Sequence, residues 1–221
     1  MKDMESRFLK ELDRLRMIIL EMAARTETAL EKSAKAFFER DVELAEEVIR
    51  GDDAINRLEV DVDRLSLRLL ALEQPMARDL RFIVGCMRIA VELERIADLA
   101  VNVARRGVFM SRRPPLPPNA SLEQLATTAL DMLRTVIDSF VRQNADEARE
   151  VCQMDDTADD LNVKVLKSLL DHMVKEAPAV ERSVQTIIVS RCLERVADQT
   201  TNIAESVIFM VLGVNIKHHC E

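Results

Sequence analysis

The sequence has little of the material that ends helices and builds turns. Its 221 residues include four glycines and six prolines, and neither tryptophan nor tyrosine occurs. Leu, Ala, Glu and Arg, which favour helices, are abundant instead. No stretch of useful length alternates between apolar and polar residues as a half-buried strand would. The composition therefore predicts a protein that is helical throughout.

The sequence also lacks a net positive charge, with 31 Lys and Arg against 39 Asp and Glu, and it lacks long apolar runs. The formal net charge is −8, so a nucleic-acid partner would lack its usual electrostatic driving force. The longest strongly apolar run, residues 207–214, is far shorter than the roughly 20 residues that cross a bilayer. We therefore expect neither nucleic-acid binding nor a membrane span.

The cysteines show no C-x-x-C spacing, and they stand at Cys86, Cys152, Cys192 and Cys220. The N-terminal sequence "MKDMESRFLKELDRLR" is too charged for a secretory signal. A reduced, cytoplasmic protein fits both observations best.

One segment interrupts the helical pattern. The stretch "SRRPPLPPNAS", which starts at Ser111, holds four of the six prolines. Gly107 is expected to cap the helix before it, and Ser121 with Gln124 to form a capping box at the start of the next helix. We therefore divide the chain into a first unit at 1–110, a Pro-rich linker at 111–120 and a second unit at 121–221.

Each unit is predicted to contain three long helices joined by short turns. Pro75, Asn144 and Pro178 mark the breaks within the units. Between the breaks, apolar residues recur three or four positions apart, as amphipathic helices require. The expected helices span residues 3–39, 41–73, 77–107, 121–142, 144–174 and 178–212.

The two units are related by an internal repeat. The segments "LERIADLAVNVA" from Leu93 and "LERVADQTTNIA" from Leu193 match at seven of twelve positions, and "DDAIN" from Asp52 is echoed by "DDTAD" from Asp155. Such self-similarity indicates duplication. The predicted fold is all-α: two tandem three-helix bundles forming an elongated six-helix protein.

The repeated segments place polar residues along one face of each third helix. A spacing of four relates Glu94, Asp98 and Asn102, and likewise Glu194, Asp198 and Asn202. If the second and third helices fold back at the prolines, these faces meet further polar residues at the same level: Asp52 beside Asp98, Asn56 beside Glu94, Asp155 beside Asp198, and Asp159 beside Glu194. So many neighbouring carboxylates resist full ionisation unless a cation lies among them.

A metal ion is the natural cation for such a site. Because all the donors are oxygens, hard or borderline ions such as Mg²⁺, Ca²⁺, Mn²⁺ or iron fit better than structural zinc, although the identity of the ion stays open. Ala97 and Ala197 stand where a di-iron enzyme would have histidine. No Gly-rich phosphate loop or nucleophile–base pair is evident. We therefore expect no enzymatic activity.

A simpler interpretation stays open. An E-x-x-x-D pattern on a helix is usually a solvated face, and Arg95 and Arg195 are placed to pair with the acids at the surface. The chain would then be a non-catalytic helical scaffold or a metal-storage protein. His172 stands alone on its helix, and the tail residues His218, His219 and Cys220 are remote from the acidic faces.

The repeated motifs resemble those of a known family. Paired E-R-x-A-D-x-x-x-N segments, each preceded by a helix opening with D-D, in two repeats split by a Pro-rich joint, are similar to the PhoU family of accessory regulators of bacterial phosphate transport. The resemblance covers essentially the whole chain. It implies a non-enzymatic negative regulator of the phosphate-starvation response that binds multinuclear metal clusters, often of iron.

The resemblance also implies partners and ligand positions. The partners are the ATPase of the phosphate ABC transporter and a phosphate-sensing histidine kinase, which would hold this cytoplasmic protein at the inner face of the membrane; a homodimer is also expected. The implied metal ligands are Glu94, Asp98, Asp155, Asp159, Glu194 and Asp198, with Asn102 and Asn202 as carbonyl donors or supporting contacts. Asn56 departs from the motif, which calls for a carboxylate, so the first site is expected to be weaker, to hold fewer ions or to be empty.

Overall fold

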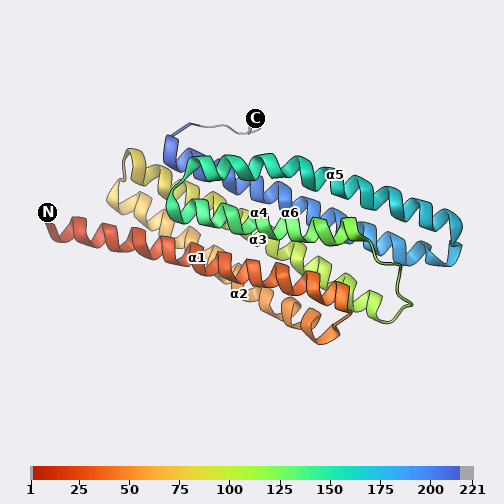
Figure 1. Ribbon diagram of the computed structural model, residues 1–221. Coiled ribbons are helices and arrows are strands. Elements are labelled where there is room, and N and C mark those ends of the chain that lie inside the picture. Colours follow the sequence, from red (N-terminus) through yellow and green to blue (C-terminus); the bar gives the residue numbers. More distant parts are fainter. Residues whose placement is uncertain (1, 215–221) are drawn as a thin grey trace.

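The protein is an elongated bundle of long helices that run roughly parallel to one another (Figure 1). The computed structural model describes residues 2–214, with side chains from Arg7 onward. The helices are α1 (Lys2–Glu39), α2 (Val42–Glu73), α3 (Ala77–Ser111), α4 (Ala120–Arg142), α5 (Ala145–Lys175) and α6 (Val180–Leu212), with a short 3₁₀ turn, η1 (Ala177–Ala179), before α6. This range contains no strand, and none of its helices is long and apolar enough to cross a membrane. The all-α prediction of two three-helix repeats is confirmed.

The two repeats make their first turn with the same local chemistry. Arg40 and Gln143 adopt left-handed backbone conformations, with φ of 62° and 53°. The next residues, Asp41 and Asn144, cap α2 and α5 by accepting hydrogen bonds from backbone N–H groups of the first helical turn, as short polar side chains do. The breaks predicted at Pro75 and Pro178 are confirmed too, because Pro75 lies in the α2–α3 turn and Pro178 in η1.

Two predicted helix ends are wrong. The helix α3 does not stop at Gly107 but continues to Ser111. Gly107 serves packing instead: a Cβ there would lie 3.4 Å from the backbone of Phe37, so glycine lets α1 and α3 approach closely. At the start of α4 the cap is Asn119, whose side chain accepts from the N–H of Leu122 at 3.1 Å, and not Ser121 in a capping box with Gln124.

Two arginines fix the segment between α3 and α4. Arg40, at the end of α1, donates hydrogen bonds to the carbonyl oxygens of Met110, Ser111 and Arg113. Arg182, near the start of α6, is 8% exposed and donates to the carbonyls of Pro114 and Pro115 and to Glu176. These bonds add side-chain donors to carbonyl groups at the end of α3 and in the Pro-rich segment, where helical backbone donors run out. The Pro-rich linker is therefore held from both repeats.

The centre of the molecule is the antiparallel packing of α3 against α6 (Figure 1). Arg81 Nε donates to the carbonyl of Met210 at 3.5 Å, and Arg106 Nη1 donates to Gln185 Oε1 at 2.9 Å. Both contacts give the same register, which places residues 95–96 level with 195–196. The two copies of the repeated segment therefore meet in the middle of the protein.

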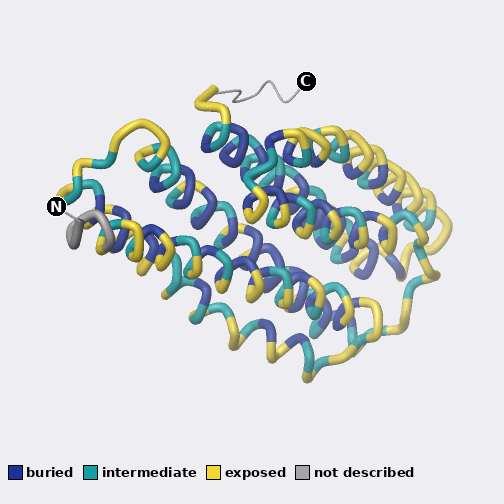
Figure 2. Tube along the Cα trace, turned by 60° about the vertical axis from the view of Figure 1, so that its left-hand side comes forward, coloured by how far each residue is buried: buried dark blue, intermediate teal, exposed yellow. Residues whose placement is uncertain are grey.

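The apolar positions of the repeated segment are buried at this centre. At most 1% of the surface is exposed for Leu93, Ile96, Ala97, Leu193, Val196 and Ala197. One continuous apolar cluster runs through both repeats, and Figure 2 shows the buried residues along the inner sides of the helices. The two repeats thus share a core.

We expect Leu93→Ala to destabilise both repeats together. The change leaves a cavity in the core cluster that runs through both repeats and should lower the free energy of unfolding by about 3 kcal/mol. Amide hydrogen exchange checks this, and the slowest amides of α2 and of α5 should accelerate to the same extent. Leu67→Ala, at a 59% exposed position, serves as the control and should change stability by less than about 0.5 kcal/mol. Acceleration confined to the first repeat would show that the repeats unfold separately.

Candidate functional site: two acidic stripes

The first acidic stripe lies along the α2–α3 hairpin. Asp52, Asn56 and Glu94 are half-buried, and Asp98 is exposed. Asn56 Nδ2 donates to Asp52 Oδ2 at 3.2 Å. Burial raises the pKa of Asp52, and the charge of Asp98 adds to that rise. For Glu94, burial and then the charges of Asp98, Glu59 and Asp52 raise the pKa. The structure therefore brings the predicted residues of the two helices together.

The second acidic stripe lies along the α5–α6 hairpin and concentrates more negative charge. Burial raises the pKa of Asp155 to about 6, with further contributions from the charges of Asp198, Asp159, Asp156 and Glu194. The pKa values of Glu194 and Asp198 are also raised, by burial first and then by the neighbouring carboxylates Asp198 and Asp159 respectively. The carboxyl groups of this hairpin resist full ionisation, as predicted from acidic residues of two adjacent helices lying at the same level.

Both stripes contain buried oxygen atoms that lack a hydrogen-bond donor. Among the described side chains these include Asp52 Oδ1, Asn56 Oδ1, Asp155 Oδ1 and Glu194 Oε2. A buried acceptor without a donor costs about 1–3 kcal/mol, and a cation would remove that cost. The donor set, carboxylate and amide oxygens, suits a hard or borderline metal ion.

The side chains as they stand are not gathered around a single point. Within residues 7–214, no group of three or more Asp, Glu, His or Cys side chains is spaced to hold a metal ion. Ligation would therefore require these side chains to converge on the ion. The donor chemistry of these residues and their unpaired oxygens suit a metal ion. Their present positions do not define a coordination geometry.

Glu59, which was not among the predicted site residues, also belongs to the first stripe. Glu59 is half-buried on α2, burial raises its pKa, with a further contribution from the charge of Asp63, and its own charge acts on Glu94. The corresponding residue of the second repeat is Asn162, whose Oδ1 accepts from Ser190 Oγ at 2.7 Å. The signal was available, because Asp52, Asn56 and Glu59 follow one another at helical spacing.

Glu59 changes the comparison between the repeats. On α2 the positions read Asp52, Asn56 and Glu59; on α5 they read Asp155, Asp159 and Asn162. Each helix thus supplies two carboxylates and one amide, with the last two positions exchanged. The number of carboxylates alone therefore gives no reason for a weaker first site.

The remaining candidates lie at the margins of the stripes or away from them. Asn102 and Asn202 are half-buried, one turn beyond Asp98 and Asp198, and no hydrogen bond of the described residues joins their side chains to a carboxylate. His172 lies toward the linker, with Nε2 3.6 Å from Glu176. The tail residues His218, His219 and Cys220 lie outside the described range.

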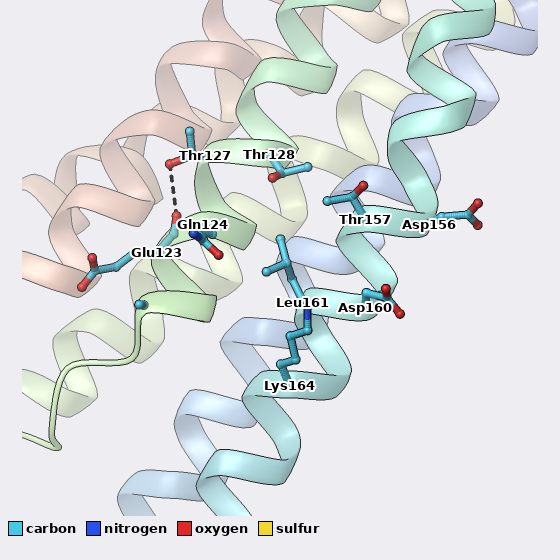
Figure 3. Close-up of a pocket in the computed structure, with 10 residues that line it drawn as sticks. Glu123, Gln124, Thr127, Thr128, Asp156, Thr157, Asp160, Leu161 and Lys164 are labelled. Atoms are coloured by element: carbon cyan, nitrogen blue, oxygen red, sulfur yellow. Dashed lines mark hydrogen bonds between the residues drawn. The ribbon is translucent and has the colours of Figure 1, made fainter.

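A separate polar cleft of about 830 Å³ lies between α4 and α5 (Figure 3). Hydroxyl groups of Thr127, Thr128 and Thr157 line it, and Thr127 Oγ1 donates to the carbonyl of Glu123 at 3.1 Å. Asp156 and Asp160 also border it. Each of them follows a stripe residue by one position, which turns it to another side of α5. None of the ten residues that line this cleft was predicted as a site residue, and the cleft is distinct from the acidic stripe.

Comparison with known proteins relates the chain to one family along both repeats. The model of the PhoU domain matches residues 19–107 and 122–207. The chain is 35% identical over 212 residues to the phosphate-specific transport system accessory protein PhoU homolog of Aquifex aeolicus (strain VF5), with 96% of each chain covered. It is 30% identical over 217 residues to the phosphate-specific transport system accessory protein PhoU of Escherichia coli (strain K12), covering 98% of this chain and 90% of that one.

Solved structures give the same relationship. The crystal structure of PhoU from Pseudomonas aeruginosa matches with a TM-score of 0.91 at 34% identity, covering 94% of this chain and all of that one. The phosphate transport system regulatory protein PhoU from Streptococcus pneumoniae matches with a TM-score of 0.87 at 26% identity, covering 94% and 98%. The family resemblance of the repeated motifs is confirmed.

We expect Asp155→Asn to stabilise the metal-free protein above its folded-state pKa. Because that pKa, about 6, exceeds the ordinary 3.8, the carboxyl group loses favourable free energy on ionising in the folded state, and stability falls as pH rises through this window. A shift of this size corresponds to about 3 kcal/mol, but Asp155 is half-exposed and solvent screens it, so we expect a gain of about 1 kcal/mol.

Urea unfolding in the presence of a chelator measures this gain. It should be present at about pH 7.5 and vanish at about pH 4, where the wild-type carboxyl group is protonated in the folded state. Asp171→Asn, an exposed position on the same helix, is the matched control. An equal effect of Asp155→Asn at both pH values would rule out the electrostatic explanation.

Proposed function

Because this chain belongs to the PhoU family, we propose that it is a non-catalytic regulator of phosphate uptake that restrains the phosphate-starvation response. It acts by binding, at the inner face of the membrane, between the ATPase of a phosphate ABC transporter and a phosphate-sensing histidine kinase. The observation that carries the proposal is the family match along both repeats, together with relatives named as accessory proteins of phosphate-specific transport.

Exposed apolar side chains support docking of protein partners on the hairpins. On α5 a run at helical spacing is between 40% and 88% exposed: Val163, Leu166, Leu170 and Val174. On the adjacent α6, Val180 and Val184 are 43% and 41% exposed. Single exposed aliphatic residues are ordinary, but contiguous ones mark interaction surfaces. We propose that this apolar stripe is a docking face.

The docking face and the acidic stripe form one continuous surface. On α5 the apolar run follows Asp155 and Asp159 along the same side of the helix, and on α6 it precedes Glu194 and Asp198. A partner helix with apolar residues at one end and basic residues at the other would complement this surface. The α2–α3 hairpin carries a similar exposed set in Val60, Leu67, Leu72, Met76 and Leu80.

We propose further that both acidic stripes bind metal ions, with the second binding more tightly. In the first hairpin the amide of Asn56 already donates to Asp52, which partly compensates that carboxylate. Asp155 is surrounded by carboxylates and has a buried oxygen without a donor. Iron, as a multinuclear cluster, is proposed on family grounds, and the oxygen donors also suit Mg²⁺, Mn²⁺ and Ca²⁺, with Zn²⁺ a poorer match. A bound ion would supply positive charge that lets the carboxylates ionise together.

We expect the double variant Glu194→Gln with Asp198→Asn to lose most of its bound metal. The matched variant Glu94→Gln with Asp98→Asn should lose less metal, because the first stripe concentrates less negative charge and attracts a cation less strongly. Elemental analysis of protein purified without added metal measures the content, and anomalous scattering from crystals identifies the element. The control pair, Glu150→Gln with Asp171→Asn, removes two exposed charges from α5 outside the stripe. Unchanged metal in both stripe variants would favour a helical scaffold with solvated acidic faces, and non-stoichiometric loading would favour metal storage.

We expect a strain without this protein to express its phosphate-starvation genes at high phosphate. The wild-type gene should restore repression, whereas Leu170→Glu with Val184→Glu should not, because charge on the docking face opposes apolar contact. Both positions are exposed, so the variant should fold, and circular dichroism checks this. Leu9→Glu, 54% exposed on α1, is the control and should complement.

Pull-downs with the transporter ATPase and the cytosolic region of the kinase, at low and moderate salt, test partner binding directly. Binding should weaken as salt screens the acidic stripe. Sedimentation of the same variants tests the proposed homodimer. Normal repression in the deletion strain, together with binding to neither partner, would contradict the proposed function.

A further inference from the structure

A groove of about 480 Å³ opens between α1 and α2, above α3. Its floor is apolar and buried, formed by Val48, Ile55, Ala97 and Val101. At one end Lys32 Nζ of α1 and Glu47 Oε1 of α2 pair at 2.5 Å across the groove, and toward the other end Arg25 pairs with Glu21 at 2.9 Å. Glu21 and Lys32, the outer members of these pairs on α1, are eleven positions apart, about 16 Å of helix. Both the volume and the concave shape are those of a small-molecule pocket.

The groove exists because the first repeat has two small residues where the second has two large ones. The helix caps Asp41 and Asn144 and the D-D pairs align the repeats, so that Ala29 corresponds to Met132 and Gly51 to Met154. Met132 is fully buried and Met154 packs against the core. The polar cleft of Figure 3 lies one turn nearer the start of α4, and its Gln124, Thr127 and Thr128 correspond to Glu21, Ala24 and Arg25 of the groove. The second repeat therefore closes only the part of this space that the methionines occupy.

Packing does not require glycine at position 51. A Cβ on Gly51 would meet nothing within 4 Å, and glycine is less favourable than other residues inside a helix. Its conformation is ordinary helix, so no turn requires it either. The glycine at position 51 lowers the stability of α2. In exchange, the first repeat keeps open a space that methionine occupies in the second repeat.

The groove carries one negative charge that no cationic side chain contacts within the described residues, although the charge of Arg105 acts on it from further away. The four rim charges pair with one another, but Asp52, which lines the groove, forms no ion pair within residues 7–214. Its Oδ2 accepts from Asn56, and its Oδ1 is buried without a donor. An occupant that suits this groove has an apolar body and one positively charged hydrogen-bond donor.

We propose that this groove binds a small aliphatic amine, with its hydrocarbon chain over Ile55, Ala97 and Val101 and its ammonium group at Asp52. The ammonium group supplies the donor that Asp52 Oδ1 lacks, after a small reorientation of that side chain. The bridge between Lys32 and Glu47 closes one end of the groove, which favours a free small molecule over a continuous helix of a partner protein. Asp52 also belongs to the first acidic stripe, so the amine and a metal ion would share this carboxylate.

Titration of the metal-free full-length protein with n-hexylamine tests the proposal. Amide and methyl chemical shifts in NMR spectra should change around Gly51, Ala97 and Val101. The neutral probe 1-hexanol should bind about tenfold more weakly because it lacks the charge, and hexanoate should not bind. Asp52→Asn should remove the preference for the amine over the alcohol.

Filling the groove provides the decisive variant. Ala29→Met with Gly51→Met installs the residues of the second repeat and should abolish binding while leaving the helical spectrum unchanged. Ala71→Met, at an exposed position of α2 outside the groove, should bind the amine as the wild type does. Binding that survives the filled groove, equal binding of amine and alcohol, or no shift at about 10 mM amine would each overturn the proposal. These outcomes do not depend on the role of the protein in phosphate regulation.

Discussion

The packing of α3 against α6 determines where every functional group of this protein lies. Each copy of the repeated segment has two faces, because residues three or four apart share one side of a helix. Ile96 lies on the side of α3 that contacts α6, the side that also carries Gly85 and Arg88, and it is buried. Glu94 and Asp98 face the neighbouring hairpin helix. The same twelve residues therefore build both the centre of the core and half of an acidic stripe. A segment with both tasks tolerates change at few of its positions, which explains why the two copies remain so similar.

Most of the fold could be predicted because it depends on local signals. Apolar spacing gave the six helices, and Pro75, Asn144 and Pro178 gave the turns. The errors arose where a distant contact decided the outcome. The helix α3 continues past Gly107, which packs against the backbone of Phe37, and it ends where Arg40 donates to the carbonyl groups of Met110 and Ser111. Neither contact has a signature in the sequence near residue 107.

The candidate site was predictable in outline and less so in detail. Counting residues from the hairpin turns placed Asp155 beside Asp198 and Asp52 beside Asp98. The charge of Asp198 raises the pKa of Asp155, and the charge of Asp98 raises that of Asp52, in agreement with that placement. Glu59 was missed because the analysis stopped at the residues of the repeated motif. The small size of Ala29 and Gly51 forms no sequence pattern, and the groove becomes evident only when the two repeats are compared in space. The extent to which burial raises the pKa of each carboxyl group likewise depends on the surrounding helices, which the local sequence does not specify.

The shared core also bears on how such a chain arose. A single repeat would leave open to water the side of its third helix that carries Gly85, Arg88 and Ile96. The antiparallel arrangement of α3 and α6 is the one that two identical copies adopt around a two-fold axis. A one-repeat ancestor would therefore have been stable only as a dimer of itself, and gene fusion would have converted that dimer into one chain, tethered by the prolines. Fusion freed the two halves to diverge, so that one could keep an open groove while the other closed it with methionine.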